Sequence, residues 1–98
     1  MNIDVLISEV GPRDGLQSIN AIMPLAARKS WITAEARAGV REIEVGSFVS
    51  QKLLPQMADT PEVVAHALSL PGLKVAALVP NAYGAAAGVE AGVQKITV

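Results

Sequence analysis

The chain has 98 residues, of which 51% are hydrophobic and 17% are charged, with a net charge of −1 and no cysteine. This composition excludes a disordered tail, and the length corresponds to one small domain or to part of a larger one. The near-neutral charge disfavours binding to nucleic acid or to an anionic membrane surface, and the absence of cysteine excludes disulfides, thiolate metal sites and a cysteine nucleophile within these residues.

The first predicted element is a strand over residues 3–10, an apolar and β-branched run of the length of a buried strand. Residues 11–15, Gly-Pro-Arg-Asp-Gly, are turn formers and end it. A helix is predicted to begin at Pro24, because the missing N–H of proline costs nothing in a first turn, and to end at Gly39. Its apolar stripe consists of Leu25, Ile32 and Ala36.

A second strand is predicted over residues 40–46, followed by a loop over residues 47–59. Thr60, Pro61 and Glu62 indicate the start of a second helix, with the Thr60 hydroxyl as its cap. The apolar stripe of that helix consists of Val63, Val64, Ala67 and Leu68, and the helix ends at Pro71-Gly72.

The third strand is predicted over residues 73–79, and the fourth begins at residue 94 and reaches the end of the chain. Between them, Asn81 caps a short helix over residues 82–91 that closes at Gly92. Strands that alternate with helices in this way predict a parallel sheet with right-handed crossovers.

Two architectures fit this order: a doubly wound sheet and part of a (β/α)₈ barrel. The loop after the first strand lacks the G-x-G-x-x-G pattern of a doubly wound dinucleotide site. A full barrel needs about 250 residues, and the chain ends inside its fourth strand. We therefore expect an α/β fold, the N-terminal half of a TIM (β/α)₈ barrel, with residues 1–98 as a single partial domain that lacks the C-terminal part.

Ligands gather at the carboxyl ends of parallel strands, and this rule selects a short list of polar residues. Asp14 can hold a hard divalent cation, and the neighbouring Arg13 can neutralise a developing oxyanion. A structural alternative stays open, in which Arg13 and Asp14 form an ion pair within the loop and Glu44 is a satisfied buried acid. The full list consists of Glu9, Arg13, Asp14, Gln17, Glu44, Ser47 and Asn81.

The remaining distinctive residues are expected to pack rather than to react. His66 is the only histidine, and in mid-helix without partners it is expected to be a packed or half-exposed residue. Trp31 is expected to pack on its helix, and Gly84 and Gly88 indicate a close helix contact.

No segment has the roughly 20 apolar residues of a membrane-spanning helix. The N-terminus lacks the basic and apolar regions of a secretory signal. A cytoplasmic location is therefore expected, with no membrane and no nucleic acid among the partners.

Residues 9–17 read EVGPRDGLQ and residues 43–50 read IEVGSFVS, with Pro55-Gln56-Met57 soon after and Pro80-Asn81 after the third strand. These blocks resemble the motifs of 3-hydroxy-3-methylglutaryl-CoA lyase, in the DRE-TIM metallolyase superfamily. The resemblance implies a barrel with Mg²⁺ or Mn²⁺ at its carboxyl end, an acyl-CoA substrate, and a retro-Claisen cleavage to acetyl-CoA and acetoacetate. A homodimer of the full-length enzyme is also expected.

By resemblance, Asp14 is a metal ligand, Arg13 stabilises the enolate oxygen, and Glu44 is an acid that supports the site. The family's other metal ligands, two histidines and an asparagine, and its catalytic cysteine come from late strands and loops, outside this chain. We therefore expect the 98-residue chain alone to be inactive, because one carboxylate rarely holds Mg²⁺. The weaker, substrate-side assignments by resemblance are Gln17, Ser47 and Asn81.

The sequence departs from the family pattern after Gln17, where Ser18-Ile19 replaces the typical Asn-Glu, and in the length and composition of the first helix. Alternatives therefore stay open: another short hydroxyacyl-CoA lyase such as citramalyl-CoA lyase, a 2-oxo-acid aldolase or acyltransferase of the same superfamily, or a non-catalytic βα module.

Overall fold

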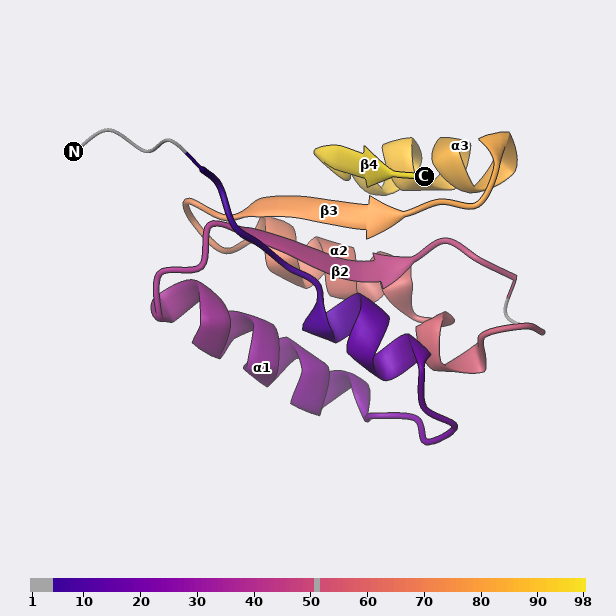
Figure 1. Cartoon of the computed structure of the whole chain (residues 1–98), viewed down its shortest axis with the longest axis horizontal. Helices are drawn as coiled ribbons and strands as arrows, with labels where there is room; N and C mark the ends of the chain where they lie inside the picture. The colour runs from indigo at the N-terminus through magenta and orange to yellow at the C-terminus, as the bar shows by residue number, and fades with distance from the viewer. Residues whose placement is uncertain (1–4, 51) are drawn as a thin grey trace.

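The computed structural model describes residues 5–50 and 52–98, which form a parallel sheet with the strand order β1-β2-β3-β4 (Figure 1). This confirms the predicted order and the α/β class. In chain order the elements are β1 (Ser8–Glu9), the π-helical turn η1 (Gly11–Gly15), α1 (Leu25–Arg37), β2 (Glu42–Ser47), the 3₁₀ turn η2 (Pro55–Met57), α2 (Thr60–Leu68), β3 (Lys74–Leu78), α3 (Ala82–Ala91) and β4 (Lys95–Thr97).

The hydrophobic core lies between α1, α2 and one face of the sheet. Ile32 of α1, Val63 of α2 and Val75 of β3 are fully buried in it. Leu25 and Ala36 pack against the same cluster, as the predicted stripe required. Leu68 departs from its predicted stripe and is 39% exposed.

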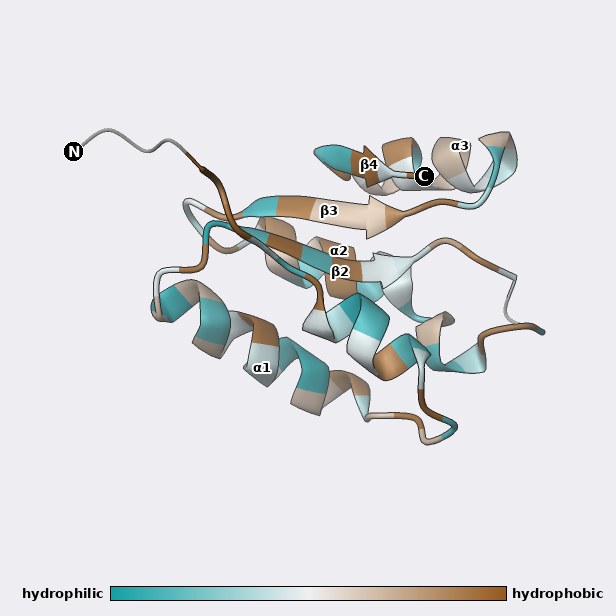
Figure 2. Cartoon of the chain, viewed as in Figure 1, coloured by the Kyte–Doolittle hydropathy of each residue, from teal (hydrophilic) through white to brown (hydrophobic). Residues whose placement is uncertain are grey.

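Hydrophilic and hydrophobic residues alternate along β2 (Figure 2). Ile43 and Val45 belong to the helix-covered core. Glu42 and Glu44 point to the other face, where they meet side chains of β4. In a closed barrel that face is the interior, so the polar residues of β2 line the inside.

A β-bulge near the carboxyl end of β2 changes which side chain reaches the inner face. Glu44 pairs with Ala76, whereas Gly46 pairs with Ala77, so one extra residue stands in β2 between them. Because side chains alternate, this extra residue moves Ser47 to the face of Glu44. A Cβ on Gly46 would lie 2.6 Å from Thr60 Oγ1, so this position requires glycine.

The first strand is much shorter than predicted. β1 pairs with β2 only at Ser8 and Glu9, and residues 5–7 run on without a partner strand, with Val5 74% and Ile7 79% exposed. The physical reason is that β2 begins at Glu42, opposite Ser8, so residues 5–7 have no strand to pair with. Residues 3 and 4 of the predicted strand lie outside the described residues.

The predicted ends of α3 are correct, whereas the predicted cap of α2 is not. Asn81 caps α3 by accepting a hydrogen bond from the Gly84 N–H at 2.9 Å, and Gly92 ends α3 with φ 95°. Both were predicted. The prediction that Thr60 caps α2 was wrong, because Asp59 is the residue before the helix and the Thr60 hydroxyl lies within hydrogen-bond distance of the Ser47 and Met57 carbonyls.

Of the residues expected to pack, His66 and Gly84 do so closely. His66 Nε2 lies 2.8 Å from Thr33 Oγ1 and 3.1 Å from the Lys29 carbonyl, across the α1–α2 contact. A Cβ on Gly84 would lie 2.7 Å from the Phe48 carbonyl, which confirms the close contact of α3. Among the helices of the described residues, none combines the length and apolarity needed to cross a membrane.

Candidate functional site

The first element of the site is η1, which follows β1 and packs against β2. The sequence predicted a plain turn here, but the segment is helical, with the Arg13 and Asp14 N–H groups both bonded to the Val10 carbonyl at 3.1 and 2.6 Å. Pro12 sits near the start of this turn, where no N–H is needed, and is buried. The Gly11 N–H donates to Glu9 Oε1 at 2.8 Å. This local geometry turns the Arg13 side chain toward β2.

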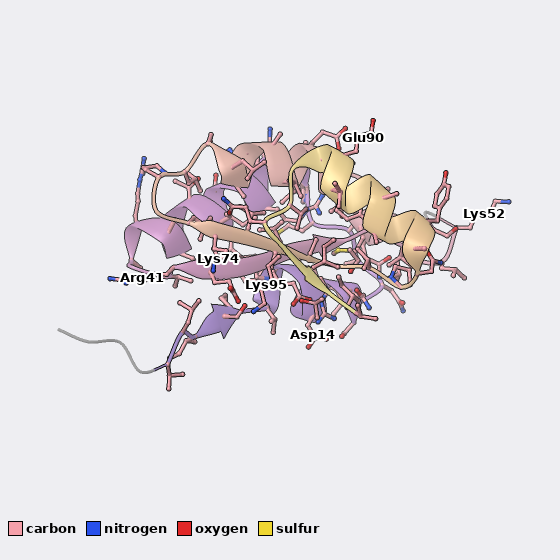
Figure 3. All side chains as sticks on the ribbon, turned by 90° about the horizontal axis from the view of Figure 1, so that it is seen from above. Asp14, Arg41, Lys52, Lys74, Glu90 and Lys95 are labelled. Carbon is pink, nitrogen blue, oxygen red and sulfur yellow. The ribbon has the colours of Figure 1, made fainter. Side chains whose placement is uncertain are left out.

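Arg13 lies between two carboxylates. Its Nε donates to Glu44 Oε1, and its Nη1 lies 3.2 Å from Asp14 Oδ1. Glu44 is 4% exposed, and its second oxygen accepts a hydrogen bond from Thr97 Oγ1 at 3.2 Å. The Asp14 side chain, labelled in Figure 3, is 61% exposed. The guanidinium is therefore fixed, while the Asp14 carboxylate faces solvent.

These contacts include those of the structural alternative: the ion pair between Arg13 and Asp14 and a satisfied buried acid at Glu44. They also leave groups for a ligand. Arg13 Nη2 and Asp14 Oδ2 make no hydrogen bond to another described residue. A pre-positioned cation with a free donor beside an open carboxylate can bind an anionic oxygen and a hard cation.

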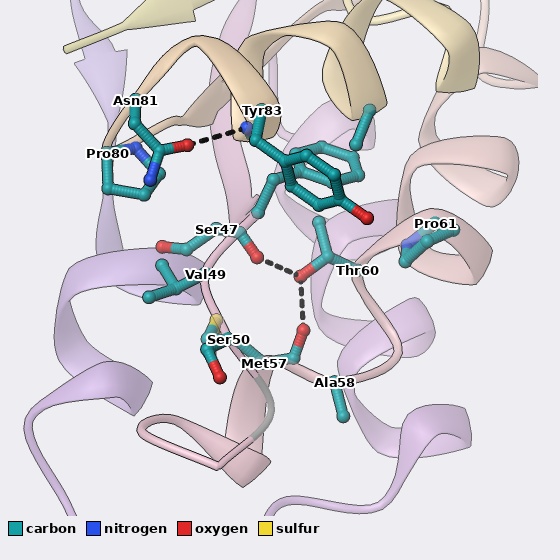
Figure 4. A pocket seen from close by; sticks show the side chains of 13 residues that line it. Ser47, Val49, Ser50, Met57, Ala58, Thr60, Pro61, Pro80, Asn81 and Tyr83 are labelled. Carbon is teal, nitrogen blue, oxygen red and sulfur yellow. Dashed lines mark hydrogen bonds between the residues drawn. The ribbon is translucent and has the colours of Figure 1, made fainter.

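A second pair extends the site along the carboxyl ends of the strands. Ser47 Oγ donates to Gln17 Oε1 at 2.7 Å, and Ser47 is buried. Ser47 also lines a cavity of about 430 Å³, which reaches from the loop after β2 to the first turn of α3 (Figure 4). Asn81 also lines this cavity. Of the predicted site residues, Ser47 and Asn81 line this cavity and Arg13, Asp14, Gln17 and Glu44 do not.

The predicted residues thus fall into three places. Arg13, Asp14 and Glu44 form the rim cluster, by which we mean these three residues. Gln17 and Ser47 pair beside it, and Asn81 stands apart at the cavity. Glu9 lies on the helix-covered face instead, since it pairs with Ile43 of the core and is near Glu35 of α1.

Sequence reasoning missed Thr97. It lies opposite Leu78, which itself lies opposite Ser47, so Thr97 shares the inner face with the rim cluster. A hydroxyl at the carboxyl end of the fourth predicted strand was an available signal, but only strand pairing shows that it meets Glu44.

Two other acids have shifted pKa values. A hydrogen bond involving Ser8 lowers the pKa of Glu42; burial opposes this, and Lys95, whose Nζ lies 3.0 Å from Glu42 Oε2, adds to the lowering. Burial raises the pKa of Glu35, and the nearby Glu9 carboxylate raises it further, against a hydrogen bond involving Trp31. The pKa values of Glu42 and Glu35 are therefore shifted in opposite directions, so ionisation of the two acids has opposite effects on stability.

The described residues provide only part of the ligand set that the predicted Mg²⁺ or Mn²⁺ site needs. In residues 5–50 and 52–98, no group of three or more His, Cys, Asp or Glu side chains is arranged to hold a metal ion. Asp14 supplies one solvent-facing carboxylate, which is the oxygen ligand that Mg²⁺ and Mn²⁺ prefer. The described residues thus fit one ligand of such a site.

Comparison with known proteins identifies clear relatives, although no family model matches the chain. The chain is 45% identical to the 3-hydroxy-3-isohexenylglutaryl-CoA/hydroxymethylglutaryl-CoA lyase of Pseudomonas aeruginosa, over 96% of this chain and 31% of that protein. It is 44% identical to the cytoplasmic 3-hydroxy-3-methylglutaryl-CoA lyase of Rattus norvegicus, over 96% of this chain and 27% of that protein.

A solved structure matches as well. The HMG-CoA lyase of Acinetobacter baumannii, in complex with coenzyme A and 3-methylmalate, superposes with a TM-score of 0.86 at 32% identity, over 98% of this chain and 32% of that one. The chain spans less than a third of the length of these three relatives. The match confirms the predicted resemblance and the predicted part-barrel fold.

Proposed function

Because the chain is related to the hydroxymethylglutaryl-CoA lyases over nearly its whole length, we propose that residues 1–98 are a partial domain of a carbon–carbon lyase. The substrate is a 3-hydroxy-3-methylglutaryl-CoA-type thioester, cleaved to acetyl-CoA and acetoacetate. The observation that carries this proposal is the rim cluster, in which a guanidinium fixed by a buried carboxylate stands beside an open one.

Arg13 is proposed to stabilise the enolate oxygen. A base takes the proton of the substrate's hydroxyl as the bond between the thioester's α-carbon and the hydroxyl-bearing carbon breaks. The hydroxyl-bearing carbon becomes the ketone of acetoacetate, and the electron pair left on the α-carbon spreads onto the thioester oxygen until a proton converts this enolate into acetyl-CoA. A cation that is already held in place stabilises that charge without reorganisation. Glu44 holds Nε of Arg13, which leaves Nη2 to meet the oxygen. Thr97, bonded to the other oxygen of Glu44, steadies the carboxylate.

Asp14 is proposed as the ligand that this chain contributes to a divalent cation, Mg²⁺ or Mn²⁺. Its Oδ2 is free of protein partners among the described residues, and its side chain is open to solvent. A cation held there, with further ligands from outside these residues, would act as a Lewis acid on oxygens of the substrate. The contact with Arg13 keeps the carboxylate at the rim.

Gln17, Ser47 and Asn81 are proposed to face the substrate. Ser47 joins the rim to the cavity of about 430 Å³, whose lining also includes Phe48, Met57 and Pro80. Such a mostly apolar pocket with a few polar groups suits an acyl chain. An acyl-CoA substrate is supported by the A. baumannii relative, which is described in complex with coenzyme A.

For the whole protein we further propose a homodimer in the cytoplasm. The rat relative is named as the cytoplasmic form, which supports the location. The assembly rests on the motif resemblance, and sedimentation of the full-length protein tests it.

The test of function is a cleavage assay on the full-length protein with either metal. We expect acetyl-CoA and acetoacetate in equal amounts, loss of turnover on chelation, and recovery when the metal is restored. Asp14→Asn is expected to weaken metal affinity about 10-fold or more. The name of the P. aeruginosa relative covers two 3-substituents, so methyl and isohexenyl substrates are assayed side by side. An inactive full-length protein with bound metal contradicts the proposal.

A further inference from the structure

Gln56 holds the segment that follows η1. It belongs to η2, and its Nε2 donates to the main-chain oxygens of Gln17 and Ile19, each at 3.0 Å. One amide therefore uses both of its hydrogens on two carbonyls that are two residues apart. Gln17 is also the residue whose side chain accepts the hydrogen bond from Ser47. The place of Gln56 thus sets where the Gln17 side chain meets β2.

Arg28 holds η2 in turn. It lies on α1, is 1% exposed, and forms an ion pair with Asp59, just beyond η2. Its Nη1 also lies 3.4 Å from the main-chain oxygen of Gln56. Among the described residues, Arg28 Nε has no hydrogen-bond partner. A buried guanidinium is costly to desolvate and is stabilised only by well-placed partners, so these contacts tie α1 closely to η2.

We propose that Arg28 and Gln56 are positioning residues of the Gln17–Ser47 pair. Neither belongs to the groups assigned to the reaction. Arg28 connects α1 to η2, Gln56 connects η2 to residues 17–19, and together they fix the distance from Gln17 to Ser47. The inference rests on the proposed function, because that distance affects catalysis only where Gln17 and Ser47 face the substrate.

Loss of Gln56 is expected to change KM, which reports on substrate binding, and to leave kcat nearly unchanged. Arg13 and Glu44 hold each other through their own ion pair and do not depend on Gln56. Loss of Gln56 therefore displaces the substrate-side pair and leaves the enolate-stabilising pair in place. A weaker ground-state interaction raises KM, whereas kcat follows the groups that act in the transition state.

The test uses Gln56→Met in the full-length enzyme, which keeps the side-chain length and removes both donors. We expect KM for the hydroxyacyl-CoA to rise about tenfold with kcat within about twofold. Hydrogen exchange in peptides covering residues 16–22 is expected to quicken, while exchange in residues 74–78 stays unchanged. The matched control is Gln94→Met: Gln94 also bonds the main chain, accepting from the Val75 N–H at 2.8 Å, but at the amino end of β3.

Arg28→Met is expected to repeat the rise in KM, and Arg28→Lys to reverse most of it, since lysine keeps the charge beside Asp59. If Gln56→Met does not fold, Gln56→Asn, one methylene shorter, gives the same readouts. KM and exchange equal to those of Gln94→Met overturn the proposal. An inactive unmodified enzyme overturns the proposed function instead, and the exchange measurement then still shows whether Gln56 holds residues 17–19.

Discussion

Glu42 and Glu44 lie two residues apart on the inner face of β2, and both are almost fully buried. Their partners differ in kind. Glu42 pairs with the ammonium of Lys95, whose side chain is 52% exposed, whereas Glu44 pairs with the guanidinium of Arg13, which is 15% exposed. A half-exposed ammonium on a flexible stem is hydrated and screened, while a planar guanidinium held by a carboxylate keeps one orientation.

Under the proposed function, this difference assigns stability to the amino end of β2 and chemistry to its carboxyl end. At the amino end, Glu42 has the half-exposed ammonium of Lys95 and a hydrogen bond involving Ser8, and no group assigned to the reaction lies beside it. At the carboxyl end, Glu44 is held from two sides, by Arg13 and by Thr97. Preorganisation of this kind is what stabilises developing charge, so under the proposed function the same residue type serves different purposes at the two ends.

The largest expected effect comes from exchanging the cation at the carboxyl end. Arg13→Lys in the full-length enzyme is expected to lower kcat about 10³-fold, because an ammonium cannot bond Glu44 and the enolate oxygen with one rigid fork. The matched change at the amino end, Lys95→Arg, is expected to leave kcat within about twofold. Steady-state kinetics of both variants, with circular dichroism to check folding, measures the contrast. Equal losses in the two variants would contradict it.

The next effect concerns the bulge that turns Ser47 toward the inner face. Gly46→Ala places a methyl group 2.6 Å from Thr60 Oγ1 and is expected to lower the free energy of unfolding by about 2 kcal/mol, as for overpacking in a core. Gly15→Ala is the matched control at the rim, because a Cβ there has no heavy atom within 4 Å. Denaturant titration compares the two. A stable Gly46→Ala variant would show that Thr60 moves aside.

Local chemistry in the sequence was enough to predict several elements. Asn81 and Gly92 bound α3 as predicted, since a cap and a left-handed glycine act within one helical turn. Gly39, with φ 102°, likewise follows α1. The order of strands and helices followed from the same local patterns, and the motif resemblance pointed to Arg13, Asp14 and Glu44 as one group.

Features that depend on distant partners were not predictable. The Thr60 hydroxyl serves a carbonyl of β2 rather than its own helix, and the bulge at Gly46 exists only in relation to β3. The contact of Thr97 with Glu44 joins residues 53 apart in sequence. β1 is short because its pairing depends on where β2 begins. In each case local propensity lacked the partner that decides the outcome.

A smaller effect is expected at the amino end of β2, where the ionisation of Glu42 makes stability depend on pH. The lowered pKa of Glu42 means that the unfolded chain binds more protons between the two pKa values, so stability rises with pH there. The stabilisation is complete above the ordinary pKa of 4.5 and is lost as pH falls through the lower folded value. Glu42→Gln is expected to cost about 1 kcal/mol at pH 7, since Lys95 is half exposed and the pair is screened.

The free energy of unfolding of wild type and of Glu42→Gln is measured at pH 7 and at pH 3. The difference in that free energy between the two proteins is expected to shrink at the lower pH. Lys95→Gln should reproduce part of the same pH dependence, because Lys95 contributes to the lowering. A difference that is constant with pH would mean that Glu42 acts through packing alone.

The smallest effect lies on the helix-covered side of the sheet, where Glu35 has the opposite shift. Its raised pKa means that the folded protein binds more protons, so Glu35 lowers stability once pH exceeds the folded pKa and has no such effect below 4.5. Glu35→Gln is expected to raise the free energy of unfolding at pH 7 by about 0.5 kcal/mol, the scale of one like-charge contact. The Glu9 carboxylate is the second cause of the raised pKa of Glu35, so a change at Glu9 tests how much that charge contributes. Glu9→Gln should remove part of the gain from Glu35→Gln, and strictly additive gains would show that burial alone raises the pKa of Glu35.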